Sequence, residues 1–503
     1  ALSINGTTVT STAAELNILD GVTSTAAELN ILDGVTSTTA ELNVLDPALK
    51  ENNSIWIGSD PSGNTGYSSA SYNTAIGVEA GEEITTGDYN TAVGSQALTA
   101  NDTGNYNTAV GFGSLKAQSG SANYNTAMGY LAGEDITLGD YNTLLGAFAG
   151  EEITTSNGTT ALGYSAGGGA SADDVTGEYN TSVGFKALQA VTTGDLNVAI
   201  GSNALGANTV GDRSVAIGHN ALLKANPASK TDTYNVAIGI NAGYELTTGV
   251  NNVFVGALSG DAITTGGDHT AVGYNALSAE DTESGATAIG NGALANQNGA
   301  TYNTAVGRHA GTDVTTGSQN TFIGYNSGNK ATTATYSTAI GYASFGSNAA
   351  ETTGNYNTAL GRATMNSVTT GTHNSVSGYV TGAKLTTGYY NTSMGSQALY
   401  YTTTGHSNTV MGYLAMYGDA GATMSGMANV AIGREALKVN TTAFYNVAVG
   451  SFSMMSNTTG NYNTAVGYGS LKDQSGSANY NTAVGFLAGE ELTTGDYNTL
   501  LGA

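Results

Sequence analysis

The sequence Tyr-Asn-Thr-Ala-Ile-Gly at residues 72–77 returns, with small variations, until the chain stops at Ala503. The glycines that close successive copies define 24 intervals between Gly77 and Gly502, and 18 of these share the same 17-residue spacing as Gly77 and Gly94. The other six intervals are slightly longer. A short, nearly constant period is typical of stacked repeats that share one continuous core. The repeat therefore predicts a rod and not a catalytic domain.

Each repeat contains the strand and turn segments that one coil of a solenoid needs. The six-residue block has strand character and ends at glycine, a small apolar pair such as Ala97-Leu98 follows, and a polar stretch such as 85–88 completes the unit. Propeller blades and helical repeats need roughly twice this length. We therefore predict an all-β fold, a parallel β-solenoid or β-roll of about 17-residue coils, over residues 72–503.

Alternation along the strand assigns its side chains to two faces, with Thr74 and Ile76 on one face and Ala75 on the other. The position of Ile76 is aliphatic in almost every repeat, so we predict that these residues form the core: Ile76, Val93, Val110, Met128, Ile200, Ile217, Val306 and Val466. The alanine face carries no Lys, Arg or Glu, which suggests that another backbone approaches it closely. A homotrimer, intertwined or side by side, explains both faces, and a single-chain solenoid with an uncharged flank is the alternative.

Two further sets of residues are expected to form columns along the rod. The coil-closing glycines include Gly77, Gly94, Gly111, Gly201, Gly307 and Gly467. The tyrosines that begin the repeat should lie above one another at about 4.8 Å, the spacing of neighbouring strands, and they include Tyr72, Tyr89, Tyr106, Tyr124 and Tyr141. We expect an aromatic ladder over the seam of the rod, which could alternatively hold sugar rings. The asparagines that follow predict a ladder of side-chain amides.

Composition limits the possible partners. The chain of 503 residues has 38 acidic and 13 basic residues and a net charge of −25, which disfavours nucleic acid and anionic membranes as ligands. It has no cysteine, so no disulfide or thiolate metal site is expected. No stretch approaches the length of continuous apolar sequence that spans a bilayer, and we therefore expect no membrane insertion.

A different repeat of 13 residues occupies the amino-terminal part, with units beginning at Ser11, Ser24 and Ser37. Each unit has the Thr-x-x-Glu spacing of a capping box, and glycine ends the first two units. We predict short helices over residues 1–47, which serve as a stalk or attachment segment, and a transition over 48–71. A tethering linker is the alternative, because helices this short are marginal alone.

Few residues suggest chemistry. Acidic pairs recur in one turn, at Glu82-Glu83, Glu134-Asp135, Glu151-Glu152 and Glu490-Glu491. Adjacent carboxylates in such a turn diverge, so a glycosidase pair is not expected; they either extend into solvent or hold a hard cation such as Ca²⁺. The five histidines are scattered. We predict no catalytic residue, no metal site and no cofactor.

The longer intervals enlarge turns at the surface of the rod, and one duplicated block of coils adds to its length. Insertions at 164–183, 219–238, 342–360 and 413–432 fall outside the strand block, where they either form an interaction face or represent neutral drift. Residues 103–147 and 459–503 differ at seven of 45 positions. Duplicating a block of coils lengthens a rod without changing its ends.

Two stretches carry a resemblance to known families. Arg213-Ser-Val-Ala-Ile-Gly218 and Asn429-Val-Ala-Ile-Gly433 resemble the head repeats of trimeric autotransporter adhesins, although the 17-residue coil is longer than the adhesin type. The Ala-Glu-Leu-Asn-Ile-Leu-Asp-Gly unit at 14–21 looks like repeats of phage tail-fibre and virion structural proteins. Together these resemblances imply a trimeric, left-handed β-roll fibre.

The combined expectation is a non-enzymatic structural fibre at the virion surface or in the extracellular space. It would be a phage tail fibre or virion appendage that projects a receptor-binding tip to the host surface. The alternatives are a bacterial secreted trimeric adhesin or extracellular filament and, as a third class, a polysaccharide-degrading tail spike. Expected partners are further copies of the chain, other fibre or virion proteins and a host-surface glycan.

Overall fold

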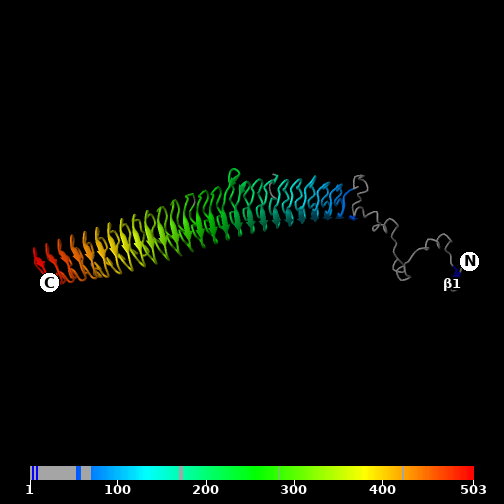
Figure 1. Cartoon of the computed structure of the whole chain (residues 1–503). Helices are drawn as coiled ribbons and strands as arrows, with labels where there is room; N and C mark the ends of the chain where they lie inside the picture. The colour runs from blue at the N-terminus through cyan, green and yellow to red at the C-terminus, as the bar shows by residue number, and fades with distance from the viewer. Residues whose placement is uncertain are drawn as a thin grey trace.

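The computed structural model describes residues 3–4, 7–8, 53–57, 69–168, 174–280, 282–421 and 424–502. These residues contain no helix, and the coils stack into a gently curved rod (Figure 1). The short helices predicted for the 13-residue units lie outside the described residues. Near the amino terminus, β1 (Ser3–Ile4) and β2 (Thr7–Thr8) form an antiparallel pair.

One three-residue strand from each coil joins a single parallel sheet of 26 strands within the described residues. The sheet starts at β3, which pairs with β4, and ends at β30, which pairs with β29, so it is an open series along the rod (Figure 1). Its strands are β3 (Ile55–Ile57), β4 (Thr74–Ile76), β5 (Thr91–Val93), β6 (Thr108–Val110), β7 (Thr126–Met128), β8 (Thr143–Leu145), β9 (Thr160–Leu162), β10 (Thr181–Val183), β11 (Val198–Ile200), β13 (Val215–Ile217), β15 (Val236–Ile238), β16 (Val253–Val255), β17 (Thr270–Val272), β18 (Thr287–Ile289), β19 (Thr304–Val306), β20 (Thr321–Ile323), β21 (Thr338–Ile340), β22 (Thr358–Leu360), β23 (Ser375–Ser377), β24 (Thr392–Met394), β25 (Thr409–Met411), β26 (Val430–Ile432), β27 (Val447–Val449), β28 (Thr464–Val466), β29 (Thr482–Val484) and β30 (Thr499–Leu501).

The register places equivalent residues directly above one another. Thr74, Ala75 and Ile76 pair with Thr91, Ala92 and Val93, and the same pattern continues along the sheet. This confirms the predicted parallel β-solenoid and its 17-residue coils. The solenoid begins earlier than predicted, because β3 lies in the segment that we assigned as a transition, and its Trp56 pairs with Ala75.

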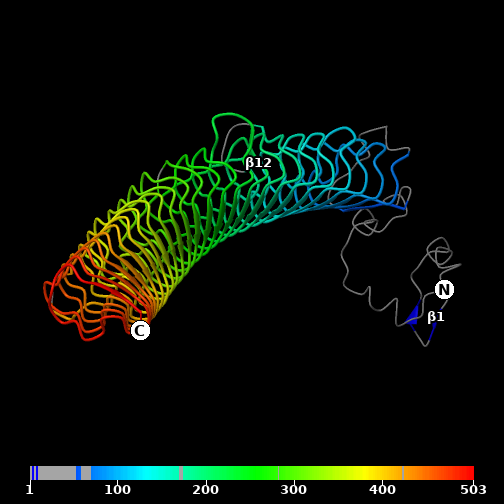
Figure 2. The same ribbon diagram turned by 60° about the vertical axis from the view of Figure 1, so that its left-hand side comes forward.

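The longer coils keep the strand and enlarge the turns, as their spacing predicts. In the coil of 219–238, the added residues contribute β14 (Thr231–Asp232), which pairs in parallel with β12 (Gly211–Asp212) of the preceding coil. Figure 2 shows this turn standing out from the rod beside β12. Isolated bridges join Ile153 to Val175 and Thr402 to Met424 in two other enlarged turns.

The alanine column, defined as the middle residue of each strand, fills the interior. Ala75 is 1% exposed, whereas its neighbour Ile76 is 39% exposed. The predicted core residues Ile76, Met128, Ile200 and Val466 are exposed on the outer face, and Val93, Val110, Ile217 and Val306 are partly exposed there. The sequence-based assignment of the two faces is therefore reversed. A 17-residue coil is narrow, and the turns supply its large apolar side chains, such as Ile84 and Leu98, so that a small residue, usually alanine, fits opposite them.

Exceptions in the alanine column show how volume is balanced. Phe254 is fully buried, and it lies between Gly243 and Gly260 of neighbouring turns. A Cβ at Gly260 would lie 2.4 Å from the Phe254 ring. Leu144 is accommodated between Gly133 and Gly150 in the same way. A large residue in the strand therefore requires glycine in the turns on both sides of it.

The coil-closing glycines are required for the coils to stack. Gly77 has φ +137°, and a Cβ on it would lie 2.6 Å from the backbone of Gly94. The same conflict recurs at the other predicted coil-closing glycines, with distances of 2.2 to 2.7 Å: Gly94, Gly111, Gly201, Gly307 and Gly467. Only glycine combines this backbone conformation with so close an approach between coils.

Candidate functional surfaces

The asparagine column, defined as the residue before each strand, ties the coils together from inside. Asn90 is 1% exposed, and its Nδ2 donates to the carbonyl of Gly104 at 2.8 Å. Its backbone N–H donates to Oδ1 of Asn73 in the preceding coil at 2.8 Å. This arrangement recurs with Asn197, Asn320 and Asn446, which confirms the predicted amide ladder. Each side chain satisfies one buried backbone donor and one buried acceptor.

His269 takes the place of an asparagine in this column. Its Nε2 donates to the carbonyl of Glu283 at 2.7 Å, and its Nδ1 accepts from the N–H of Ala286 at 3.2 Å. These are the two bonds that an asparagine side chain would make, and they require the neutral ring. Burial lowers the pKa of His269, against a smaller upward effect of its bond to the Glu283 carbonyl and of Glu280.

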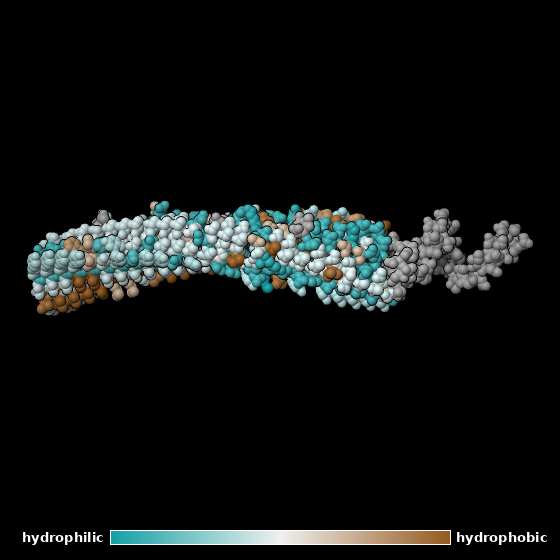
Figure 3. All heavy atoms as spheres, turned by 90° about the horizontal axis from the view of Figure 1, so that it is seen from above, coloured by the Kyte–Doolittle hydropathy of each residue, from teal (hydrophilic) through white to brown (hydrophobic). Residues whose placement is uncertain are grey.

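The outer sheet face, defined as the first and third residues of each strand, is uncharged, with mostly threonine at the first position and mostly aliphatic residues at the third. In the 26 described strands of the sheet the first residue is Thr, Val, Ser or Ile, and the third is Ile, Val, Met, Leu or Ser. Figure 3 shows apolar side chains in a band along one edge of the carboxyl-terminal part of the rod. Monomeric soluble proteins rarely expose so extended an apolar surface, so this face is a candidate for association.

The tyrosine column borders this face. Successive rings from Tyr72 to Tyr141 have centroids 4.8 to 5.1 Å apart and interplanar angles of 2° to 3°. The predicted aromatic ladder is therefore present. Each tyrosine inside the stack uses both ring faces on its neighbours, which leaves only edges and hydroxyl groups for a ligand. Sugar stacking on these rings is consequently restricted to the ends of a stack.

A second aromatic column, which we did not predict, follows the closing glycines. Phe112 stacks on Tyr130 with centroids 5.5 Å apart. Arginine also occupies this column: the guanidinium of Arg362 lies 5.4 Å from the ring centroids of both Tyr342 and Tyr379. A planar guanidinium can replace a ring in such a stack. The signal that could have found this column is the recurrence of Tyr, Phe or Arg directly after glycine.

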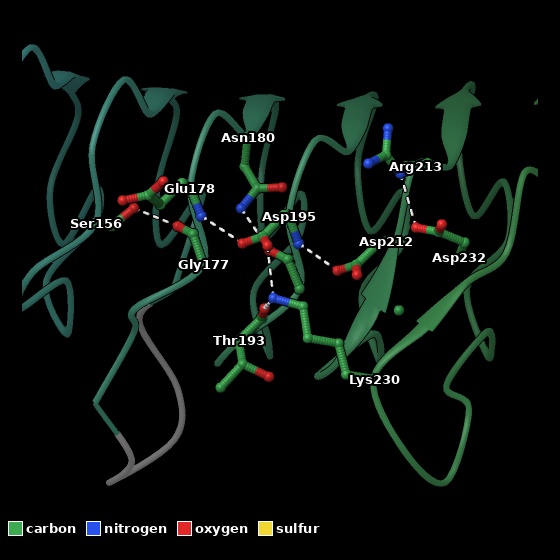
Figure 4. Close-up of polar contacts among 12 residues, drawn as sticks. Ser156, Gly177, Glu178, Asn180, Thr193, Asp195, Asp212, Arg213, Lys230 and Asp232 are labelled. Carbon is green, nitrogen blue, oxygen red and sulfur yellow. Dashed lines mark hydrogen bonds and ion pairs between the residues drawn. The ribbon is translucent and has the colours of Figure 1, made fainter.

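Carboxylates and amides form another column on the turns. The backbone N–H of Glu178 donates to Oδ1 of Asp195 at 2.8 Å, and the N–H of Asp195 donates to Oδ1 of Asp212 at 2.6 Å (Figure 4). Burial raises the pKa of Asp212, while its bond from the Asp195 N–H and the charge of Lys230 act in the opposite direction. Stacking coils therefore brings like charges close together here.

Two cations offset this repulsion. Lys230, from an enlarged turn, reaches back to Oδ2 of Asp195 at 2.5 Å and to the carbonyl of Thr193 at 2.9 Å (Figure 4). Arg213 pairs with Asp232 at 2.7 Å. The enlarged turn of 219–238 is thus linked to the preceding coils by two ion pairs.

The predicted acidic pairs are partly neutralised by protein groups. Glu134 pairs with Lys116 at 3.0 Å, and Glu490 pairs with Lys472 at 2.9 Å. Burial first, and then the charges of Glu152 and other acidic neighbours, raise the pKa of Glu151 to about 7. Across the described residues, His, Asp and Glu form no group of three or more that could hold a metal ion.

The sequence was compared with known proteins, and the described residues were searched for membrane-spanning helices. Comparison with protein-family models gives no match, and comparison with curated proteins gives none either. Within the part of the chain that the structure describes, no helix has the length and apolar character needed to cross a membrane.

Proposed function

We propose that the chain is the shaft of an extended, non-enzymatic fibre. The observation that carries this proposal is the single parallel sheet, in which 26 strands keep one register without interruption. With one strand per coil at about 4.8 Å, the rod would be roughly 120 Å long. Its repeated internal contacts serve reach and stiffness.

The proposed setting is a phage tail fibre or comparable virion appendage, in which the shaft projects a receptor-binding tip. The amino-terminal units at 14–21, which look like repeats of virion structural proteins, favour this setting. A bacterial secreted adhesin or extracellular filament is the second candidate, favoured by the adhesin-like strands at 213–218 and 429–433.

We further propose a homotrimer in which the copies meet through the outer sheet face. The alanine column is buried inside each coil, so it cannot contact another chain. The outer sheet face has no charge, whereas the turns carry the acidic side chains, so copies of a chain with net charge −25 repel one another least through this face.

Electron microscopy and light scattering of the purified protein test the two parts separately. Rods of roughly 120 Å are expected, with a mass three times the 50.4 kDa of the chain. A compact globular particle would contradict the shaft. A rod with the mass of one chain would contradict only the trimer.

A further inference from the structure

The longest stretch of the chain without a carboxylate side chain is 352–418, between Glu351 and Asp419. This stretch includes eight of the 29 tyrosines and two of the five histidines. Four closing glycines, from Gly361 to Gly412, lie within it, so the stretch makes up about four coils of the rod. We call it the acid-free zone. Its charge differs from that of the remaining chain, because its only formal charges are those of Arg362 and Lys384.

The two cations of the acid-free zone are available to a ligand. Eight other lysines and arginines of the described residues form ion pairs with Asp or Glu, and neither Arg362 nor Lys384 does. Both side chains are exposed. Arg362 is also held in place, because Tyr342 and Tyr379 flank its guanidinium and Nη1 donates to the Tyr379 hydroxyl at 3.0 Å.

In the turn beside Lys384, two tyrosines replace the acidic pair found in other coils. Tyr400 and Tyr401 occupy the positions that Glu151 and Glu152 occupy in another coil. Tyr400 packs edge-to-face on Tyr401 at 4.6 Å, and both contact Tyr417 at 5.3 Å between ring centroids. The backbone N–H of Lys384 donates to the carbonyl of Tyr400. A cation and an aromatic cluster therefore lie on adjacent coils.

The acid-free zone is long enough to be electrostatically distinct. Four coils at about 4.8 Å extend over roughly 19 Å. The Debye length at physiological salt is about 8 Å, so carboxylates beyond the ends of the zone are largely screened at its centre. An anionic polymer is repelled by most of a rod with net charge −25 and meets the least repulsion here.

We propose that the acid-free zone binds an anionic polysaccharide whose charges are widely spaced, such as a polyuronate. Its acidic groups pair with Lys384 and Arg362, and its sugar rings pack on the cluster of Tyr400, Tyr401 and Tyr417. Two cations are too few for a nucleic acid, whose affinity grows with each neutralised phosphate. This inference rests on the proposed exposure of the shaft to a cell surface, and it adds a contact along the flank of the rod rather than at its tip.

Binding of the full chain to alginate, a polyuronate, tests the proposal, with uncharged dextran and duplex DNA as comparison probes. We expect alginate binding that weakens with salt. The variants Arg362→Gln/Lys384→Gln and Tyr400→Glu/Tyr401→Glu should each lower the affinity by roughly ten-fold or more. The second variant restores the acidic pair that other coils carry, so the coil should still fold. Lys186→Gln/Arg308→Gln is the matched control: it removes two cations outside the zone that also lie over rings.

The proposal is overturned if the control variant loses as much affinity as the zone variants, or if dextran binds as well as alginate. Tighter binding of duplex DNA than of alginate would also overturn it and would point to a nucleic-acid ligand. If the protein forms rods in electron micrographs and does not bind alginate, this inference fails and the shaft proposal stands. If it forms no rods, the shaft proposal fails instead.

Discussion

The inner and outer faces of each strand differ in burial and in which side chains they accept. On the inner face, Ala75, Ala92 and their equivalents are buried and small, and the adjoining asparagines bond both to backbone groups and to the next coil. On the outer face, Ile, Val, Met, Leu and Ser all occur at one position, and the side chains are partly exposed. The inner face determines whether a coil can form. The outer face varies in shape but not in charge, as the proposed contact between copies requires.

The largest effect is expected where the coils touch through backbone alone. In Gly307→Ala, the new Cβ would lie 2.7 Å from the backbone of Gly324, at a residue with φ +136°. We expect a loss of more than about 4 kcal/mol in unfolding free energy, measured by denaturant titration. Gly421→Ala is the matched control, because Gly421 has nearly the same φ, +137°, and, its chain neighbours aside, no atom of the described residues lies within 4 Å of the place that its Cβ would take. Equal losses in the two variants would show that backbone strain, not coil contact, dominates.

A large interior side chain gives the next effect. Phe254→Ala should cost about 3–4 kcal/mol, because the flanking glycines cannot fill the cavity that it leaves. Val255→Ala, the neighbouring change on the outer face, should cost less than about 1 kcal/mol in a single chain. Unfolding free energies of both variants, measured at several protein concentrations, sharpen the comparison. A larger, concentration-dependent cost at Val255 would show that another copy covers the outer face.

Charge on the outer face should separate the copies without unfolding them. Ile289→Lys/Val306→Lys places cations on adjacent strands of the outer sheet face, and we expect its mass by light scattering to fall to that of one chain. Its circular dichroism should remain that of the parent. Ala305→Lys, on the inner face, should instead unfold the coil, since a lysine cannot be accommodated there. A double variant that keeps the parent mass would exclude this face as the interface.

The smallest effect concerns His269. Its folded-state pKa is lowered by burial, so the unfolded chain binds the additional proton first as pH falls. Stability should therefore decrease as pH falls below the unfolded pKa of about 6.5, and the decrease ends below the folded pKa. His269→Asn restores the common ladder residue and should remove that part of the pH dependence in thermal melts. An unchanged pH profile would mean that the ring does not titrate with unfolding.

The repeat predicted the architecture because a constant 17-residue period places equivalent residues of successive coils opposite one another in the sheet. The spacing of the glycines identified the coils and the enlarged turns, and the spacing of the tyrosines identified the stacked rings. It could not decide which face of a three-residue strand is inside. Ile76 is more apolar than Ala75, but the width of the coil, which depends on Ile84 and Leu98 from the turns, gives alanine the interior position. The second aromatic column and the bridge from Lys230 to Asp195 depend on coils that meet only after folding.

The direction of the sheet hydrogen bonds has a mechanical consequence. Bonds such as that from the N–H of Gly94 to the carbonyl of Ile76 join one coil to the next, so they are loaded in series when the two ends of the rod are pulled apart. The chain passes once around each coil before it enters the next. Under tension a terminal coil can peel away alone, and its released chain extends to roughly 58 Å. A fibre built this way would lengthen in discrete steps and absorb a sudden load, rather than break across its width.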